Sequence, residues 1–119
     1  MEDASFDVVI VNSVLNLAWD LEGALREAAR ALVPDGFLYH AGVFADEPLS
    51  PAAMEAFARA GNVFGAARSQ DGFARIAVER AGFSSCAFER ERTVEPDGSD
   101  AAEELRGRSF TAAIACARR

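Results

Sequence analysis

Five residues that follow the first apolar segment of the chain are candidates for a ligand pocket: Asn12, Ser13, Asn16, Leu17 and Trp19. Ligands of open α/β sheets bind beyond the carboxyl ends of the strands, and the segment 6–11, which we predict to be a strand, ends just before them. The Asn16 amide has donors and an acceptor for a polar ligand group, although an asparagine in such a loop also serves to close a turn. Trp19 could lie over a ligand or cover apolar core.

Other residues with reactive side chains do not form a recognisable catalytic set. His40 lies inside an apolar segment, where a general base would need a partner carboxylate, so a core or strand-end histidine is the simpler interpretation. Asp46 and Glu47 could accept protons at the pocket end, or they are solvated loop charges. Cys86 and Cys116 are too few and too isolated for a disulfide framework or a zinc site, and we expect both to be small buried residues. The sequence predicts no metal site.

Composition limits the class of protein. The chain has 119 residues, half of them hydrophobic, which suits one domain with a single core. Its formal charge is −7 and all 12 basic residues are arginines. Phosphate-rich partners require a basic patch, so we expect neither nucleic acid nor an anionic membrane surface as a partner. No signal peptide and no apolar run of membrane-spanning length is recognisable, which predicts a cytoplasmic protein.

The order of the predicted elements indicates an α/β fold. Residues 6–11 include four consecutive β-branched apolar residues, as in a parallel strand that is buried on both faces. Asp20 is a candidate N-cap for a helix that ends near Pro34-Asp35-Gly36, and Ser50-Pro51 begins another helix. The remaining predicted elements are strands at 37–44, 83–94 and 109–117, a helix at 69–81, and one helical turn within 101–105. We expect the last strand to be antiparallel and to form a hairpin with the strand before it.

Three stretches of the sequence resemble class I S-adenosylmethionine-dependent methyltransferases: 6–17, 25–27 and 31–38. The likeness is greatest to the arsenite methyltransferase branch, and it continues through 61–67, 81–83 and 110–114. It begins at the fourth strand of that family. The resemblance therefore implies a single methyltransferase-like C-terminal half-domain over residues 1–119. Half of a Rossmann-like fold is expected, with about four strands (two parallel crossovers plus a C-terminal antiparallel strand) and helices mainly on one face.

The resemblance also implies which chemistry the chain lacks. The family binds S-adenosylmethionine with a glycine-rich turn after its first strand and an acidic residue after its second, and neither has a counterpart here. The glycine pair Gly61 and Gly65 has no strand-turn-helix context and is expected to break a helix. Where the arsenite branch has thiols for the metalloid, this sequence has Ser13 and Asn62, which are poor ligands for arsenic. We therefore expect no arsenite methylation and no independent catalysis.

A half fold also leaves surfaces that need a partner. One neighbour of the strand at 6–11 would be missing, and its unpaired backbone groups would form an association site. The open face of the sheet would be apolar as well. The sequence therefore predicts either a homodimer or a complex with a separate protein that supplies the N-terminal half, through the strand edge or the open face. Three interpretations remain open: one half of a split methyltransferase, a non-catalytic dimeric module that binds a small molecule or a protein, or a fragment of a longer gene product. The methyl acceptor is not determined by the fold.

Overall fold

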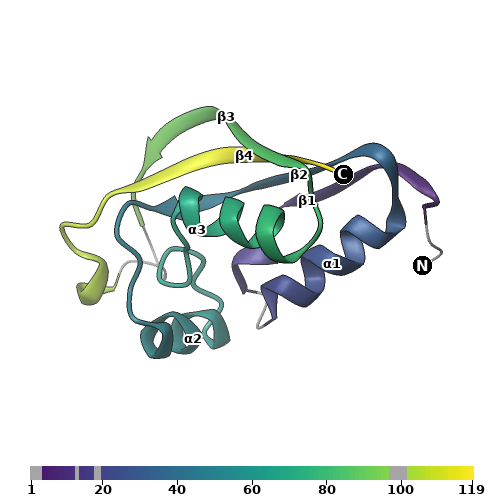
Figure 1. Cartoon of the computed structure of the whole chain (residues 1–119). Coiled ribbons are helices and arrows are strands. Elements are labelled where there is room, and N and C mark those ends of the chain that lie inside the picture. The colour runs from purple at the N-terminus through teal and green to yellow at the C-terminus, as the bar shows by residue number, and fades with distance from the viewer. Residues whose placement is uncertain (1–3, 13, 18–19, 97–101) are drawn as a thin grey trace.

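The structure is a computed structural model that describes residues 4–12, 14–17, 20–96 and 102–119. It consists of a four-stranded sheet with three helices beneath it (Figure 1). In chain order the elements are β1 (Phe6–Asn12), the 3-10 turn η1 (Val14–Leu17), α1 (Leu21–Ala31), β2 (Leu32–Ala45), α2 (Pro51–Arg59), α3 (Gln70–Arg75), the π-helical turn η2 (Ile76–Arg80), β3 (Ser85–Val94), the 3-10 turn η4 (Glu103–Leu105) and β4 (Phe110–Arg118). Within these ranges no helix is long and apolar enough to cross a membrane.

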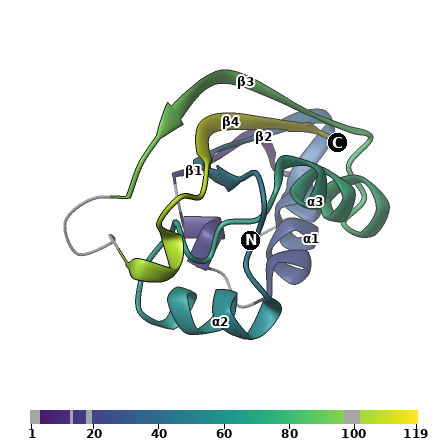
Figure 2. The same ribbon diagram turned by 90° about the vertical axis from the view of Figure 1, so that its left-hand side faces the viewer.

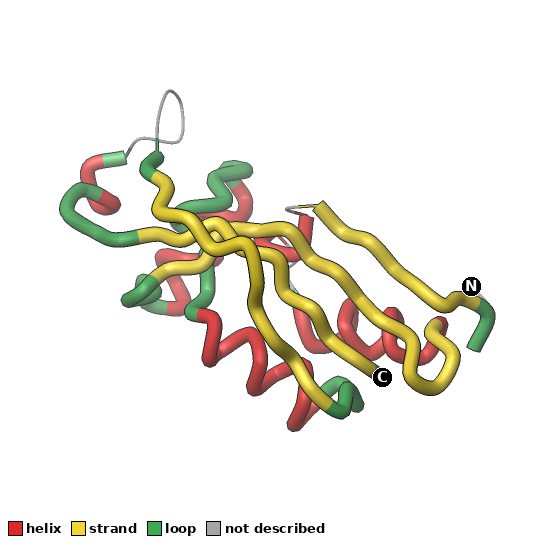
Figure 3. Tube along the Cα trace, turned by 90° about the horizontal axis from the view of Figure 1, so that it is seen from above, coloured by secondary structure: helices red, strands yellow, loops and turns green. Residues whose placement is uncertain are grey.

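The strand order in the sheet is β1-β2-β4-β3. β1 and β2 are parallel, and β4 is antiparallel to both β2 and β3, so β3 has the direction of β1 and β2. This confirms the predicted α/β half fold of four strands and the hairpin of the last two. The sequence did not indicate that β4 inserts between β2 and β3. Figure 3 shows the four strands side by side in front of the helices.

The helices begin where the sequence predicted. The Asp20 carboxylate accepts a hydrogen bond from Gly23 N at 3.0 Å, and the Ser50 hydroxyl caps α2, with Pro51 in its first turn. The predicted helix at 69–81 is present as α3 followed without a break by η2, with Ser69 as its N-cap. β2 is longer than predicted because pairing with β1 already begins at Leu32. The Pro34-Asp35-Gly36 turn lies inside β2, as an interruption of the pairing register.

The main core lies between the sheet and the helices (Figure 2). From β2, Leu38, His40 and Phe44 point to this side and are at most 2 % exposed. β4 contributes only small side chains to it, since Ala113, Ala115 and Ala117 are buried while its larger residues point to the other side. The space above these alanines is filled from the helices and from β3, by side chains that include Phe73 and Phe88.

The other face of the sheet is covered at one end only, where Ala45 and Phe110 pack with Ala67 and Leu105 in a second buried cluster. Among the described residues, α1, α2 and α3 all lie on the same side (Figure 1). Val8 and Ile10 of the edge strand β1 are 46 % and 77 % exposed, and Tyr39 and Ile114 continue this open face across β2 and β4. β1 therefore has the free edge that the sequence predicted. The prediction that β1 is buried on both faces is wrong, because only Val9 and Val11, on the helix side, are half-buried.

Candidate functional site

A cavity of about 440 Å³ lies on the open face near the end of β1. We call it the open-face cavity. The strands β1, β2 and β4 contribute Asn12, Ala41, Gly42, Val43, Ala112, Ala113 and Ile114; β3 contributes Arg90, Arg92 and Val94; and the loop after α2 contributes Phe64. Asn12 pairs with Ala41 in the sheet, and Ala41 pairs with Ile114. The cavity therefore has a floor of small and aliphatic side chains at the carboxyl end of β1, where open α/β sheets bind their ligands.

A β-bulge in β3 places the two arginines at the rim of this cavity. The pairing of β3 with β4 shifts between Glu89 and Arg92, so the strand contains an extra residue at this point. Arg90 has a φ of +55°, in the left-handed region that residues other than glycine rarely adopt. As a result Arg90 and Arg92 both line the cavity, while the intervening Glu91 lies on the helix side, where it accepts a hydrogen bond from Gln70.

The loop 61–67 forms the aromatic wall of the open-face cavity. Asn62 is 6 % exposed, and its side-chain oxygen accepts hydrogen bonds from Phe64 N at 3.0 Å and Gly65 N at 3.2 Å. Phe64 packs edge-on against Phe110 with 5.2 Å between the ring centroids. Gly61 ends α2 with a φ of +77°. The prediction that this glycine pair breaks a helix is confirmed, and Asn62 has a structural function in the turn that follows.

The sequence-predicted pocket residues are only partly placed. Asn12 lines the open-face cavity. Leu17 is half-buried in η1. Asn16 belongs to the same turn, but its side chain is outside the described part of the structure, as are Ser13 and Trp19 altogether. The prediction that these five residues surround a ligand therefore stays a prediction. The sequence reasoning missed Arg90 and Arg92, because a bulge in β3 has no clear sequence signal when its left-handed position is not a glycine.

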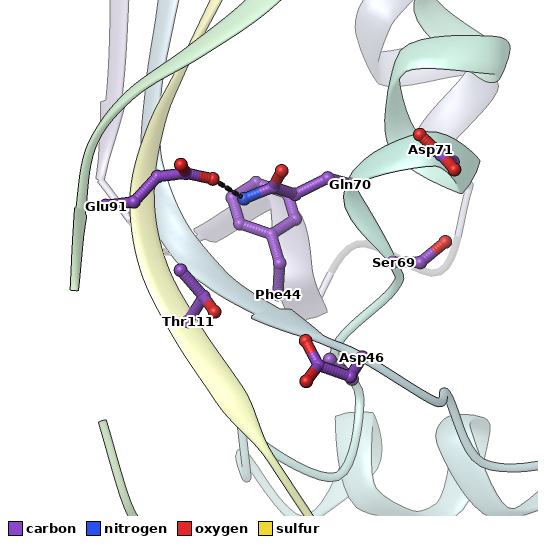
Figure 4. A pocket seen from close by; sticks show the side chains of 8 residues that line it. Phe44, Asp46, Ser69, Gln70, Asp71, Glu91 and Thr111 are labelled. Atoms are coloured by element: carbon purple, nitrogen blue, oxygen red, sulfur yellow. Dashed lines mark hydrogen bonds between the residues drawn. The ribbon is translucent and has the colours of Figure 1, made fainter. Parts of the chain in front are cut away.

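A second cavity, of about 290 Å³, lies on the helix side between α3 and the end of β2 (Figure 4). Three carboxylates line it, from Asp46, Asp71 and Glu91, and the Gln70 amide donates to Glu91 across it at 2.5 Å. The lining of this cavity is therefore negatively charged. Of the predicted proton acceptors, Asp46 is an exposed lining residue, and the backbone oxygen of Glu47 accepts from Arg108. Over the described ranges, no group of three acidic, histidine or cysteine side chains is arranged to hold a metal ion.

His40 is a core residue. It is 1 % exposed, its ring lies 5.2 Å from that of Phe73 and 5.8 Å from that of Phe44, and its Nδ1 has no hydrogen-bond partner. Burial lowers the pKa of His40 from its ordinary 6.5 to about 4, although a hydrogen bond to the backbone of Val11 opposes this shift. The imidazole is therefore neutral near pH 7 and is enclosed by core side chains, as the simpler interpretation of the sequence predicted.

The two cysteines are half-buried, not fully buried as predicted. Cys86 packs against the main core, and burial is the largest cause that raises its pKa, to about 11, with the neighbouring Cys116 as a second cause. Burial, followed by the nearby Glu89 carboxylate, also raises the pKa of Cys116. Neither thiol lines the two cavities described above. Both thiols are therefore protonated and weakly nucleophilic near pH 7.

Comparisons with known proteins agree with this architecture. Residues 1–40 match the family model described as a methyltransferase domain. The crystal structure of an arsenic(III) S-adenosylmethionine methyltransferase from Chlamydomonas reinhardtii superposes with a TM-score of 0.81 at 26 % identity, over 97 % of this chain and 38 % of the other. A Haemonchus contortus phosphoethanolamine N-methyltransferase in complex with S-adenosylhomocysteine superposes with a TM-score of 0.67 at 15 % identity, over all of this chain and 35 % of the other. The chain thus has part of the Rossmann-like fold of class I methyltransferases.

The sequence comparison indicates which branch of the methyltransferases this chain resembles. The chain is 34 % identical over 113 residues to an arsenite methyltransferase from Aquipseudomonas alcaligenes. The aligned region is 95 % of this chain, which spans about a third (32 %) of the length of that relative. The resemblance to a partial class I methyltransferase near the arsenite branch is confirmed.

Proposed function

We propose that residues 1–119 are the acceptor-binding half-domain of an S-adenosylmethionine-dependent methyltransferase. In this proposal they act together with cofactor-binding residues outside this sequence, on the same or another polypeptide. The observation that carries the proposal is the position of the open-face cavity. It lies at the carboxyl end of β1, between Asn12 and the loop that begins at Gly61, on a sheet that matches known methyltransferases.

The described residues do not fit the cofactor by themselves. Neither described cavity is formed by a glycine-rich turn between a strand and a helix, which would let the backbone approach a nucleoside closely. The open-face cavity has two arginines at its rim, and these oppose a sulfonium cation. The contribution of this chain is therefore to bind and orient the methyl acceptor.

The acceptor in this proposal is not arsenite. The resemblance places two thiols of the arsenite branch at Ser13 and Asn62 of this sequence. Asn62 is buried and uses its side-chain oxygen for two backbone hydrogen bonds, so it is not directed at a ligand. A hydroxyl and an amide are hard ligands and do not replace soft thiolates for a metalloid.

A chimera tests this function. Residues 1–119 replace the aligned segment of the Aquipseudomonas alcaligenes relative, so that the remainder of that protein supplies the cofactor site. We expect the chimera to bind S-adenosylmethionine in isothermal titration calorimetry, and the isolated chain to show no binding at millimolar cofactor. Arsenite methylation by the chimera should be at least about a hundredfold slower than by the unaltered relative, because the thiols that bind the metalloid are lost.

The control is the same chimera with Ser13→Cys and Asn62→Cys, which restores the two thiols and is expected to regain part of the arsenite activity. Micromolar binding of the cofactor by the isolated chain, or no binding by a folded chimera, would contradict the proposal. Undiminished arsenite methylation by the unmodified chimera would contradict the assignment of the acceptor.

The exposed outer part of β1 favours a second candidate function, a non-catalytic dimeric module. Ile10 is 77 % exposed on an edge strand whose free backbone groups could pair with a second copy or with a protein that supplies the N-terminal half. In this alternative the isolated chain is a dimer at micromolar concentration in size-exclusion chromatography with light scattering. Ile10→Lys is expected to weaken the association at least about tenfold, because it places a charge in an apolar contact.

Val78→Lys is the matched control, since Val78 is 39 % exposed on η2, on the helix side. A well-folded monomer at about 100 μM would exclude the dimeric module. Equal weakening by both variants would show that the contact does not involve β1.

A further inference from the structure

The two cavities described above, one on each side of the sheet, differ in the sign of their charge. The helix-side cavity has three carboxylates and no basic residue in its lining, whereas the open-face cavity has Arg90 and Arg92 and no acidic residue. This contrast occurs in a chain with a formal charge of −7. The open-face cavity is therefore a region of positive charge on an acidic protein.

Neither arginine side chain has a partner within the described structure. Most arginines with a described contact pair with a neighbouring carboxylate, such as Arg26 with Glu22 and Arg59 with Glu55. In contrast, the guanidinium groups of Arg90 and Arg92 make no ion pair or hydrogen bond with any residue that the structure describes. The nearest carboxylate along the strand on this face, Glu89, is close to the Cys116 thiol and is not part of the lining. The two guanidinium groups are therefore available to an anion.

The backbone at Arg90 provides a second, independent observation. Its left-handed conformation, with φ at +55°, is strained for a residue with a side chain, and glycine would adopt it without this cost. In a bulge of this kind glycine is the usual residue at the left-handed position. An arginine at this position adds a cation to the cavity rim at the expense of backbone strain, a combination that is found at binding sites.

The rest of the lining indicates what the anion is attached to. Ala41, Val43, Ala112 and Ile114 form an apolar floor, and the Phe64 ring forms one wall. Water is poorly bound on such a surface, so a flat apolar group gains from burial in it. At about 440 Å³ the cavity is of a size that small organic ligands occupy. Guanidinium groups match the two oxygens of a carboxylate.

We propose that the open-face cavity binds an organic carboxylate, with the carboxylate between Arg90 and Arg92 and an aromatic or aliphatic body on the apolar floor. That this ligand is the methyl acceptor rests on the proposed function. Its binding does not, because every contact involved belongs to the described part of this chain.

The test uses the whole 119-residue chain and phenylacetate as the probe. Binding is measured from chemical-shift changes of the backbone amides in ¹H–¹⁵N spectra. We expect saturable shifts at residues of the cavity, such as Ala41, Phe64 and Ala112. Phenylacetamide, which has the same shape without the charge, is expected to bind at least about tenfold more weakly, as loss of a charge-assisted hydrogen bond predicts. Inorganic phosphate is also expected to bind at least about tenfold more weakly because it has no apolar body.

Three variants separate binding from folding. Arg92→Ala should lower the affinity for phenylacetate about tenfold, and Arg92→Lys should retain part of the affinity that the alanine variant loses. Arg90→Gly should weaken binding about fivefold while the urea midpoint stays equal or rises, because glycine relieves the left-handed strain. Arg75→Ala is the charge-matched control, since Arg75 is on α3 and has no described ion pair. It should leave the affinity unchanged.

Equal binding of phenylacetate and phenylacetamide, shifts outside the cavity, or full affinity in the Arg90→Gly Arg92→Ala double variant would overturn the inference. Equal affinity for phosphate and phenylacetate would also overturn it, because the apolar floor would then play no part. None of these results depends on S-adenosylmethionine. A chimera that fails to bind the cofactor would therefore leave the phenylacetate measurement valid. Likewise, a chain that fails to bind phenylacetate would leave the cofactor measurement on the chimera valid.

Discussion

Phe44→Ala is expected to lower the free energy of unfolding by about 3 to 5 kcal/mol, as truncation of a buried phenylalanine usually does. Phe44 lies on β2, is 2 % exposed and is the centre of an aromatic cluster. Its ring packs edge-on against those of Phe88, Phe73 and His40, with centroids 5.1, 5.7 and 5.8 Å away. The variant leaves a cavity between the sheet and α3, and the surrounding rings fill it only in part. Urea denaturation followed by circular dichroism measures the loss.

Phe37→Ala is the matched control, because Phe37 lies on the same strand but on the open face, where it is only half-buried against Tyr39. Its loss should cost about 1 kcal/mol. Phe44→Leu covers the case in which the alanine variant does not fold, with an expected cost of about 1 to 2 kcal/mol. Equal costs for Phe44→Ala and Phe37→Ala would show that the core is not on the helix side of the sheet.

Acidification from about pH 7.5 to pH 4.5 is expected to remove about 2 to 3 kcal/mol of stability through His40 alone. Its pKa is lowered to about 4 in the folded chain by burial and is near 6.5 in the unfolded chain. Between these two values the unfolded state binds a proton that the folded state does not. The free energy of unfolding therefore falls as the pH falls through 6.5 and continues to fall until about pH 4, where the folded state also becomes protonated.

His40→Phe isolates this contribution, because phenylalanine retains a ring against Phe73 and Phe44 but does not titrate. Urea midpoints of the two proteins at both pH values give the difference. The other acidic and basic groups are common to both proteins, so their effects cancel. A wild-type chain whose stability changes with pH as little as that of His40→Phe would show that His40 is not buried in the neutral form.

Much of the fold could be predicted from local sequence. Asp20, Ser50 and Ser69 cap the helices where predicted, because a capping side chain acts on backbone groups within three residues of itself. Gly61 and Gly82 end helical segments with positive φ values of 77° and 94°. The apolar run 6–11 predicted a parallel strand beside β2, and its exposed edge followed from the family's strand order.

The candidate site was less predictable. Asn12 was identified from its place at the end of a strand, and it lines the open-face cavity. Arg90 and Arg92 come from β3, nearly eighty residues later, and reach the same cavity because β4 lies between β2 and β3 in the sheet. Likewise, the alternation of larger and smaller side chains in β4 did not reveal which side of the strand faces the main core. The side with the alanines faces it, because the aromatic rings that cover these alanines come from other elements.

The sequence by itself determined the helix ends, the strand types, the acidic character and the resemblance to methyltransferases, since each depends on neighbouring residues or on composition. Tertiary structure alone decided that β4 inserts between β2 and β3, that one face of the sheet stays open, and that a bulge at Arg90 gives this open face a positively charged rim. The physical reason is that strand order, facing and bulge geometry depend on contacts between residues far apart in the chain, and such contacts have no local sequence pattern.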